Sequence, residues 1–320
     1  MSDAKAALVL GATGGVGGET AAALLRHGWT VVAMARDPAR RPQAMADALA
    51  GATWMRGDAM KADDVLRAAE GVQAIIHAVN PPGYRDWGNL VLPMIDHSIA
   101  AAKATGARVV LPGTIYNYGY DAFPELVEDS LQHPVTEKGR IRVELERTLE
   151  AGSREGAPAL IVRFADFFGP APGNNWYSQG LVTPGQRLGA ITYPGRRGVG
   201  HAWAYLPDLG ETMAELVEKT PAQGFELYHF AGHYDADGEA MIGAIRKAAG
   251  RKLPVSAFPW PLVTLLSPFV RVFRELLEMR YLWQAPLRLD NAKLVGVLGR
   301  EPHTPLDEAV GATLRQLKCL

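Results

Sequence analysis

Several features that would direct a functional assignment are missing from this sequence. Its 320 residues contain one cysteine, Cys319, which excludes an intramolecular disulfide and predicts a reducing compartment. The N-terminal residues show no signal-peptide pattern, so we expect a cytoplasmic protein. No Cys/His cluster has metal-ligand spacing and no Gly-x-Ser-x-Gly motif occurs, which removes support for a metal site and for serine-hydrolase chemistry.

The sequence also lacks an excess of charge of one sign and a long uninterrupted apolar run. The net charge of -1 gives no reason to expect nucleic acid or an anionic membrane as a partner. The most apolar late segment, 258–273, is interrupted by three prolines and is too short to cross a bilayer. We therefore expect this segment to pack inside a lobe. We therefore expect a small-molecule substrate, and neither nucleic acid nor a membrane as a partner. Whether the protein forms a homodimer stays open.

A glycine-rich turn near the N-terminus organises the chain. The apolar run 8–10 stops at Gly11, and the spacing that follows is Gly-x-x-Gly-x-x-Gly. A strand, a glycine-rich turn and a helix in this order predict a dinucleotide site, because glycine lets backbone N–H groups approach a pyrophosphate at the positive end of the helix. The expected cofactor contacts in the turn are Gly11, Thr13, Gly14, Gly15, Val16 and Gly17.

The end of the second predicted strand, 30–35, indicates which dinucleotide binds. NAD enzymes place an acidic residue at this position to hold the ribose hydroxyls. This chain has Arg36, followed by Asp37, with Arg40 and Arg41 close by. Arginine can pair with a 2′-phosphate, so NADP is favoured. In the alternative interpretation the basic loop is only solvated and Asp37 reaches the ribose, which leaves NAD open.

Further strands are predicted at 53–55, 72–79 and 108–111 from their apolar character. In an open parallel sheet, ligands bind at the carboxyl ends of the strands. Asp58, Ala78 and Asn80 follow such ends and are therefore expected on the cofactor side. We interpret His77 as a packed histidine.

The segment after the fifth strand reads Thr114-Ile115-Tyr116-Asn117-Tyr118-Gly119. It resembles a signature of the extended short-chain dehydrogenase/reductases, the NAD-dependent epimerase/dehydratase family, in which a Ser-rich turn ends in Val-Tyr-Gly. Family-like stretches also occur later, at 163–170, 205–209 and 298–306. The similarity covers nearly the whole chain.

This resemblance implies an α/β fold with a Rossmann-type doubly wound parallel sheet and a small C-terminal substrate lobe. The expected boundaries are residues 1–170 plus about 201–232 for the dinucleotide-binding domain, and about 171–200 plus 233–320 for the lobe. Thr114 takes the place of the family's catalytic Ser/Thr.

The chain departs from the family at the catalytic Tyr-x-x-x-Lys pair, which becomes Lys138 and Arg142. Arg142 could still hold the nicotinamide ribose, but arginine does not release a proton. The proton donor is then Lys138 with a depressed pKa, or Tyr116 or Tyr118, or there is none. A solvated helix face is the alternative interpretation for Lys138.

Residues 169–200 are rich in Gly, Pro, Asn and aromatics, as substrate loops often are, although ordinary loops and packing explain the same composition. The candidate substrate contacts in and around this stretch are Phe168, Asn175, Trp176 and His201. The resemblance and the aromatic content together favour an NAD(P)-dependent oxidoreductase acting on a small organic carbonyl or alcohol. Two alternatives stay open, a nucleotide-sugar epimerase/dehydratase and a catalytically silent NADP-binding sensor.

Overall fold

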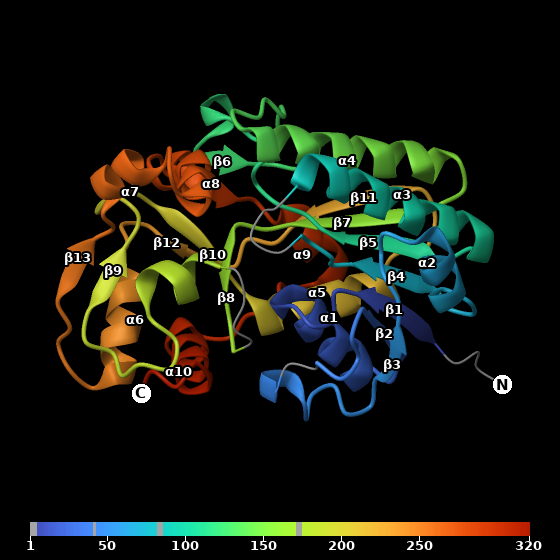
Figure 1. The fold of residues 1–320 in the computed structure, drawn as a ribbon, viewed down its shortest axis with the longest axis horizontal. Coiled ribbons are helices and arrows are strands. Elements are labelled where there is room, and N and C mark those ends of the chain that lie inside the picture. The colour runs from blue at the N-terminus through green and yellow to red at the C-terminus, as the bar shows by residue number, and fades with distance from the viewer. Residues whose placement is uncertain (1–4, 41–42, 82–85, 171–174) are drawn as a thin grey trace.

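A seven-stranded parallel sheet forms the centre of the molecule (Figure 1). The computed structural model describes residues 5–40, 43–81, 86–170 and 175–320. The strand order in the sheet is β11-β7-β5-β4-β1-β2-β3, and each neighbouring pair is parallel. The strands are β1 (Ala6–Leu10), β2 (Thr30–Ala35), β3 (Thr53–Arg56), β4 (Ala74–His77), β5 (Arg108–Pro112), β7 (Ala159–Arg163) and β11 (Phe225–His229). The expected Rossmann-type sheet is confirmed.

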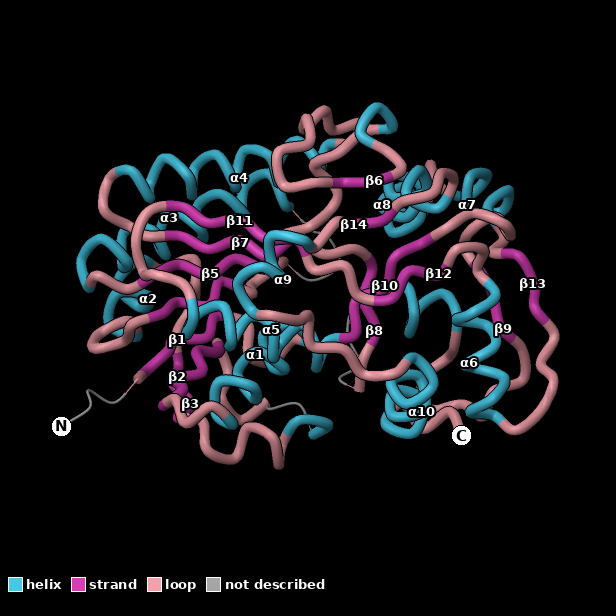
Figure 2. The backbone as a smooth tube through the Cα atoms, turned by 180° about the vertical axis from the view of Figure 1, so that it is seen from behind, coloured by secondary structure: helices cyan, strands magenta, loops and turns pink. Residues whose placement is uncertain are grey.

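Helices cover both faces of this sheet, in agreement with the doubly wound pattern (Figures 1 and 2). One face carries α1 (Gly15–Arg26), α5 (Leu206–Lys219) and α9 (Ala292–Leu298). The other carries α2 (Ala62–Ala68), α3 (Trp87–Thr105) and α4 (Glu137–Arg154). Strand β1, in the centre of the sheet, is apolar throughout because both of its faces are buried. Val9 belongs to the first core and Leu8 to the second, so successive side chains enter opposite cores.

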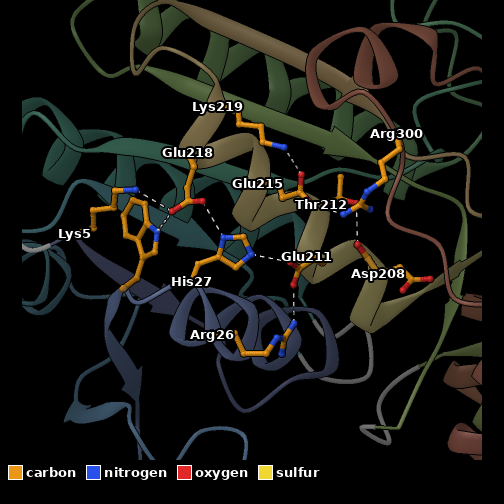
Figure 3. A network of polar contacts seen from close by, with 11 residues as sticks. Lys5, Arg26, His27, Asp208, Glu211, Thr212, Glu215, Glu218, Lys219 and Arg300 are labelled. Carbon is orange, nitrogen blue, oxygen red and sulfur yellow. Dashed lines mark hydrogen bonds and ion pairs between the residues drawn. The ribbon is translucent and has the colours of Figure 1, made fainter.

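A polar network fastens α1 to α5 at the edge of the first core (Figure 3). His27, which ends α1, contacts the carboxylates of Glu211 at 2.7 Å and Glu218 at 2.9 Å. Partial burial opposes the charged imidazole, but the hydrogen bonds to both glutamates outweigh it and raise the pKa of His27. Lys5 and the indole N–H of Trp29 also bind Glu218. The network therefore holds the start of the chain against a helix from its second half.

The second lobe is built around aromatic side chains. Outside the central sheet the described chain forms a sheet of β8 (Asp166–Phe168), β10 (His201–Tyr205) and β12 (His233–Asp235), and the pairs β9 (Ile191–Tyr193) with β13 (Val255–Ala257) and β6 (Glu125–Leu126) with β14 (Arg288–Leu289). The helices of this lobe are α6 (Glu239–Ala249), α7 (Trp260–Leu266), α8 (Arg271–Met279) and α10 (Leu306–Gln316). Short turns are η1 (Gln43–Met45), η3 (Tyr120–Ala122), η4 (Tyr177–Leu181) and η5 (Arg280–Trp283). Trp203 and Trp283 lie fully inside this core, with ring centroids 5.5 Å apart.

One local expectation needs correction. The segment 258–273 forms α7 and the start of α8, and only part of it packs inward. Trp260 and Val263 are buried, whereas the side chains of Leu265 and Phe269 are 71% and 86% exposed.

None of the helices in the described part of the chain is both long and apolar enough to cross a membrane.

Candidate cofactor and active site

A cavity of about 710 Å³ lies at the carboxyl ends of the central strands. Strand β1 has β2 on one side and β4 on the other, so the chain changes direction across the sheet at this point. Ligands of open α/β sheets bind at such a switch point. We call the part next to Arg36 the β2 end and the part next to Thr114 the β5 end.

The glycine turn forms the floor of the cavity between these ends. Gly11 has a φ of 88°, and a Cβ on it would overlap the backbone of Ala78. A Cβ on Gly17 would overlap the carbonyl of Gly11. Without these side chains, α1 begins directly at the cavity, its N-cap Gly14 offers no side-chain cap, and its first turn holds no acidic residue. The unpaired N–H groups of a helix start in such a cradle fit a pyrophosphate.

All predicted cofactor residues are described, and they line the same cavity, namely Gly11, Thr13, Gly14, Gly15, Val16, Gly17, Arg36, Asp58, Ala78, Asn80 and Arg142. Their contact with a cofactor stays a prediction. At the β2 end, Arg36 and Arg40 are exposed and line the cavity together with Asp37. The guanidinium of Arg40 lies 3.2 Å from the carboxylate of Asp37 and partly neutralises its charge. Arg41 lies outside the described residues.

The β5 end brings Thr114, Tyr116 and Arg142 to one wall of the cavity. The Thr114 hydroxyl accepts a hydrogen bond from the backbone N–H of Tyr116 at 3.2 Å. Arg142 is buried and its guanidinium lies 5.0 Å from the ring centre of Trp87. These three side chains supply a hydroxyl, a phenol and a permanent positive charge within one hollow.

His77 also borders the cavity and is held neutral. Burial, with a smaller contribution from the charge of Arg142, lowers its pKa to about 3. Its Nδ1 is 2.8 Å from the hydroxyl of Ser98. This neutral histidine agrees with the packed histidine expected from the sequence.

Lys138 is not part of the cavity wall, which corrects the expectation that it faces the reacting group. Its side chain is 4% exposed, and its Nζ lies 2.5 Å from the carboxylate of Glu275 and also contacts that of Glu278, both on α8. The other oxygen of the Glu278 carboxylate accepts the backbone N–H of Glu137 at 2.7 Å. Lys138 therefore joins the start of α4 to α8. The alternative interpretation, in which Lys138 lies on a solvated helix face, is also wrong, because its side chain is buried.

Tyr118 is also removed from the list of proton donors by its position. It is fully buried, and its hydroxyl contacts Arg163 and lies 3.3 Å from Nε2 of His229. Burial raises the pKa of Tyr118 to about 12. Arg163 is in turn bound to the carboxylate of Glu146 at 2.5 Å. Tyr118 thus belongs to a buried polar network behind the cavity.

The predicted substrate residues divide into two groups. Asn175 and Trp176 line the cavity. Phe168 and His201 lie in the lobe core instead, where His201 stacks on Trp283 with 3.8 Å between ring centroids. The latter two expectations are corrected, because both side chains are buried away from the cavity, with Nε2 of His201 2.9 Å from the carboxylate of Asp166.

The sequence reasoning missed several wall residues, and three of them come from segments without a recognisable motif. They are Trp87, Gln179 and Leu276, the last of which comes from α8. No local motif marks any of them, because each reaches the cavity only through tertiary packing.

Comparison with known proteins agrees with this geometry. Residues 11–166 match the family model described as NAD(P)H-binding. No curated protein matches the sequence. One similar solved structure is UDP-glucuronic acid 4-epimerase from Bacillus cereus in complex with NAD, with 18% identity, a TM-score of 0.77, and coverage of 98% of this chain and 96% of that chain. A second is UDP-glucose 4-epimerase from Bifidobacterium longum in complex with NAD⁺ and UDP, with 16% identity, a TM-score of 0.76, and coverage of 98% of each chain. A third is a nucleoside-diphosphate-sugar epimerase from Pseudomonas aeruginosa, with 17% identity, a TM-score of 0.71, and coverage of 99% of this chain and 98% of that chain. At these identities the similarity concerns the fold.

Proposed function

Since residues 11–166 match the NAD(P)H-binding family and the whole chain has the fold of the NAD-dependent epimerase/dehydratases, the extended short-chain dehydrogenase/reductases, we propose that this protein is an NADP(H)-dependent oxidoreductase. Its substrate is a small, largely apolar carbonyl compound or alcohol. The observation that carries this proposal is the composition of the β5 end, where Thr114, Tyr116 and Arg142 meet an otherwise mostly uncharged wall.

The preference for NADP(H) rests on the β2 end. Arg36 and Arg40 border the cavity, and the only acid of this group, Asp37, is engaged by Arg40. Two guanidinium groups bind the charged 2′-phosphate of NADP(H) more strongly than the neutral 2′-hydroxyl of NAD(H). We expect Arg36→Ala to weaken NADPH binding at least tenfold and to change NADH binding less than twofold, as measured by fluorescence titration of each nucleotide.

The chemistry at the β5 end follows from the functional groups present. NADPH held by the glycine turn, Arg36 and Arg142 would supply a hydride to the carbonyl carbon. Tyr116 donates its phenolic proton to the carbonyl oxygen, Thr114 donates a hydrogen bond to the same oxygen, and solvent reprotonates Tyr116. Arg142 cannot exchange a proton at ordinary pH, so it contributes positive charge that favours the tyrosinate and holds the cofactor. In the reverse direction Tyr116 accepts the proton of the alcohol.

The substrate class follows from the wall opposite these groups. Phe167, Trp176 and Leu276 supply an apolar surface, and Asn175 and Gln179 supply two neutral amides. Among the described wall residues, Arg142 is the one cation at this end, and it already lies against Trp87. A nucleotide sugar carries a diphosphate that needs charged donors. An apolar carbonyl compound needs none.

The test measures NADPH oxidation with a panel of aromatic and aliphatic aldehydes and ketones. We expect turnover with members of this panel, a loss of at least a hundredfold in kcat for Tyr116→Phe, and a loss of about tenfold for Thr114→Ala. Tyr120→Phe is the matched control, because Tyr120 is half exposed, bonds Gln284 and does not border the cavity. It should retain full activity.

Two other results would replace the proposal. Binding of NADPH without turnover of any panel member would favour a cofactor-binding sensor. Interconversion of UDP-sugars would favour an epimerase, the activity named for the structurally similar proteins. Full activity of Tyr116→Phe would refute the assigned proton donor while leaving the oxidoreductase itself standing.

A further inference from the structure

The hairpin formed by α7 and α8 exposes apolar side chains on its outer side. We call this surface the hairpin face. It consists of Leu262 (51% exposed), Leu265 (71%), Phe269 (86%) and Val272 (49%). Single exposed apolar residues are ordinary, but four of them within eleven residues of sequence form a contiguous feature that needs a partner.

The hairpin is held in place by its inner side. Trp260 and Val263 of α7 are buried in the lobe core, and the Trp260 indole donates a hydrogen bond to the carbonyl of Pro194 at 2.8 Å. On α8, Phe273 and Leu277 pack against the same core. Two side chains per helix thus fix the orientation of the hairpin. Leu262 and Leu265 lie on the opposite side of α7 from these buried residues, and Phe269 lies in the turn between the two helices.

The charged residues within the segment 258–274 are of one sign. Between Phe258 and Arg274 the sequence contains no acidic residue, while Arg271 and Arg274 are both exposed. The next acid, Glu275, is bound to Lys138 at 2.5 Å and also approaches Arg271 at 3.6 Å. The exposed apolar side chains are therefore bordered by guanidinium groups and by no unpaired carboxylate of this segment.

Apolar side chains bordered by arginines match the chemistry of an anionic bilayer surface, where acyl chains lie just below phosphate groups. Helix α7 lies at the side of the second lobe away from the central sheet in both views of the fold (Figures 1 and 2), while α8 contacts the start of α4 through Glu275 and Glu278.

We propose that the hairpin face docks the protein on the surface of an anionic lipid bilayer. Leu262, Leu265 and Phe269 enter the headgroup region, and Arg271 and Arg274 bind lipid phosphates. This revises the expectation from net charge alone that no membrane is contacted, because a net charge of -1 for the whole chain does not describe the charge of a single segment such as 258–274.

The test is co-sedimentation of the full chain with vesicles of phosphatidylglycerol and phosphatidylcholine in equal parts, and with vesicles of phosphatidylcholine alone. We expect binding to the mixed vesicles that is at least tenfold tighter than to phosphatidylcholine and weakens as NaCl rises from ~0.1 to ~0.5 M. The double variant Leu265→Ser/Phe269→Ser should weaken it at least tenfold. Arg271→Gln/Arg274→Gln should remove most of the preference for the anionic lipid.

The matched control is Leu66→Ser/Val297→Ser, which replaces two exposed apolar residues of α2 and α9 (41% and 38% exposed) far from the hairpin. It should bind vesicles as the parent does. Equal circular dichroism spectra and unfolding midpoints establish that all variants fold.

Two results would overturn the proposal. One is the absence of binding to the mixed vesicles, or binding that the hairpin substitutions leave intact. The other is a dimer in sedimentation equilibrium that Leu265→Ser/Phe269→Ser dissociates, which would assign the hairpin face to a second copy of the chain.

Discussion

Substituting Lys138 by methionine tests whether this residue is structural, as the contact with α8 indicates. Methionine keeps the length of the side chain and removes the charge between the carboxylates of Glu275 and Glu278. Removing one partner of a fully buried ion pair costs about 3–5 kcal/mol. Here the two glutamates are 18% and 24% exposed and water can partly solvate them, so we expect a loss of about 2 kcal/mol in the free energy of unfolding.

The measurement is urea unfolding of the parent, Lys138→Met, and the triple variant that adds Glu275→Gln and Glu278→Gln. The triple variant no longer carries two unpaired carboxylates, so it should recover about half of the lost stability. Arg140→Met is the control on the same helix. Its pair with Glu137 is 59% and 66% exposed, and its loss should cost less than about 0.5 kcal/mol.

The same variant separates a structural from a catalytic role. If Tyr116 is the proton donor, Lys138→Met keeps the pH profile of kcat of the parent at temperatures below its unfolding transition. A variant with parental stability and an abolished or shifted pH profile would refute the structural assignment. A stability loss with an unchanged profile would support it.

Three further predictions follow from individual positions. Gly17→Ala should reduce NADPH affinity at least tenfold in a fluorescence titration, because its Cβ would overlap the carbonyl of Gly11. Gly243→Ala, in the middle of α6 with no neighbour near its Cβ, should instead raise the urea midpoint, with a gain of about 0.5–1 kcal/mol. His27→Gln should cost about 1 kcal/mol at pH 5.5 and markedly less at pH 9, compared by urea unfolding. Because the pKa of His27 is raised in the folded protein, its stabilising contribution is complete below the pKa of the unfolded state, about 6.5, and is lost as the pH rises through the pKa of the folded state. Glu218 stays ionised over this pH range, because hydrogen bonds that outweigh its burial lower its pKa to about 2.

The strands and the cofactor cradle were predictable because their signals are local. β1 is apolar at every position and β5 at every position after Arg108, since both faces of the parallel sheet are covered, and that pattern is visible in the sequence. The glycines at 11 and 17 are required by contacts within one strand-turn-helix unit, with Ala78 as the one distant neighbour. Short-range chemistry of this kind needs no knowledge of the tertiary structure.

The β5 end was predicted less well because its side chains are arranged by distant segments. Tyr116 and Tyr118 stand two residues apart in one turn, and nothing in their sequence distinguishes them. Arg163 and His229, 45 and 111 residues away from Tyr118, hold it in the core and leave Tyr116 at the cavity. Likewise the contact between Lys138 and Glu278 joins residues 140 positions apart.

The divergence of Lys138 and Arg142 follows from these neighbours. The two residues are one turn apart on α4, and a shared face would place two cations together. Arg142 is instead drawn to Trp87 of α3, where a planar guanidinium can lie over an aromatic ring, and Lys138 to the carboxylates of α8, where a compact ammonium can sit between two acids. At the position where the resembled family has a tyrosine, Lys138 makes a contact between α4 and α8. The proposed reaction needs a phenol, and Tyr116 is the one described tyrosine that borders the cavity.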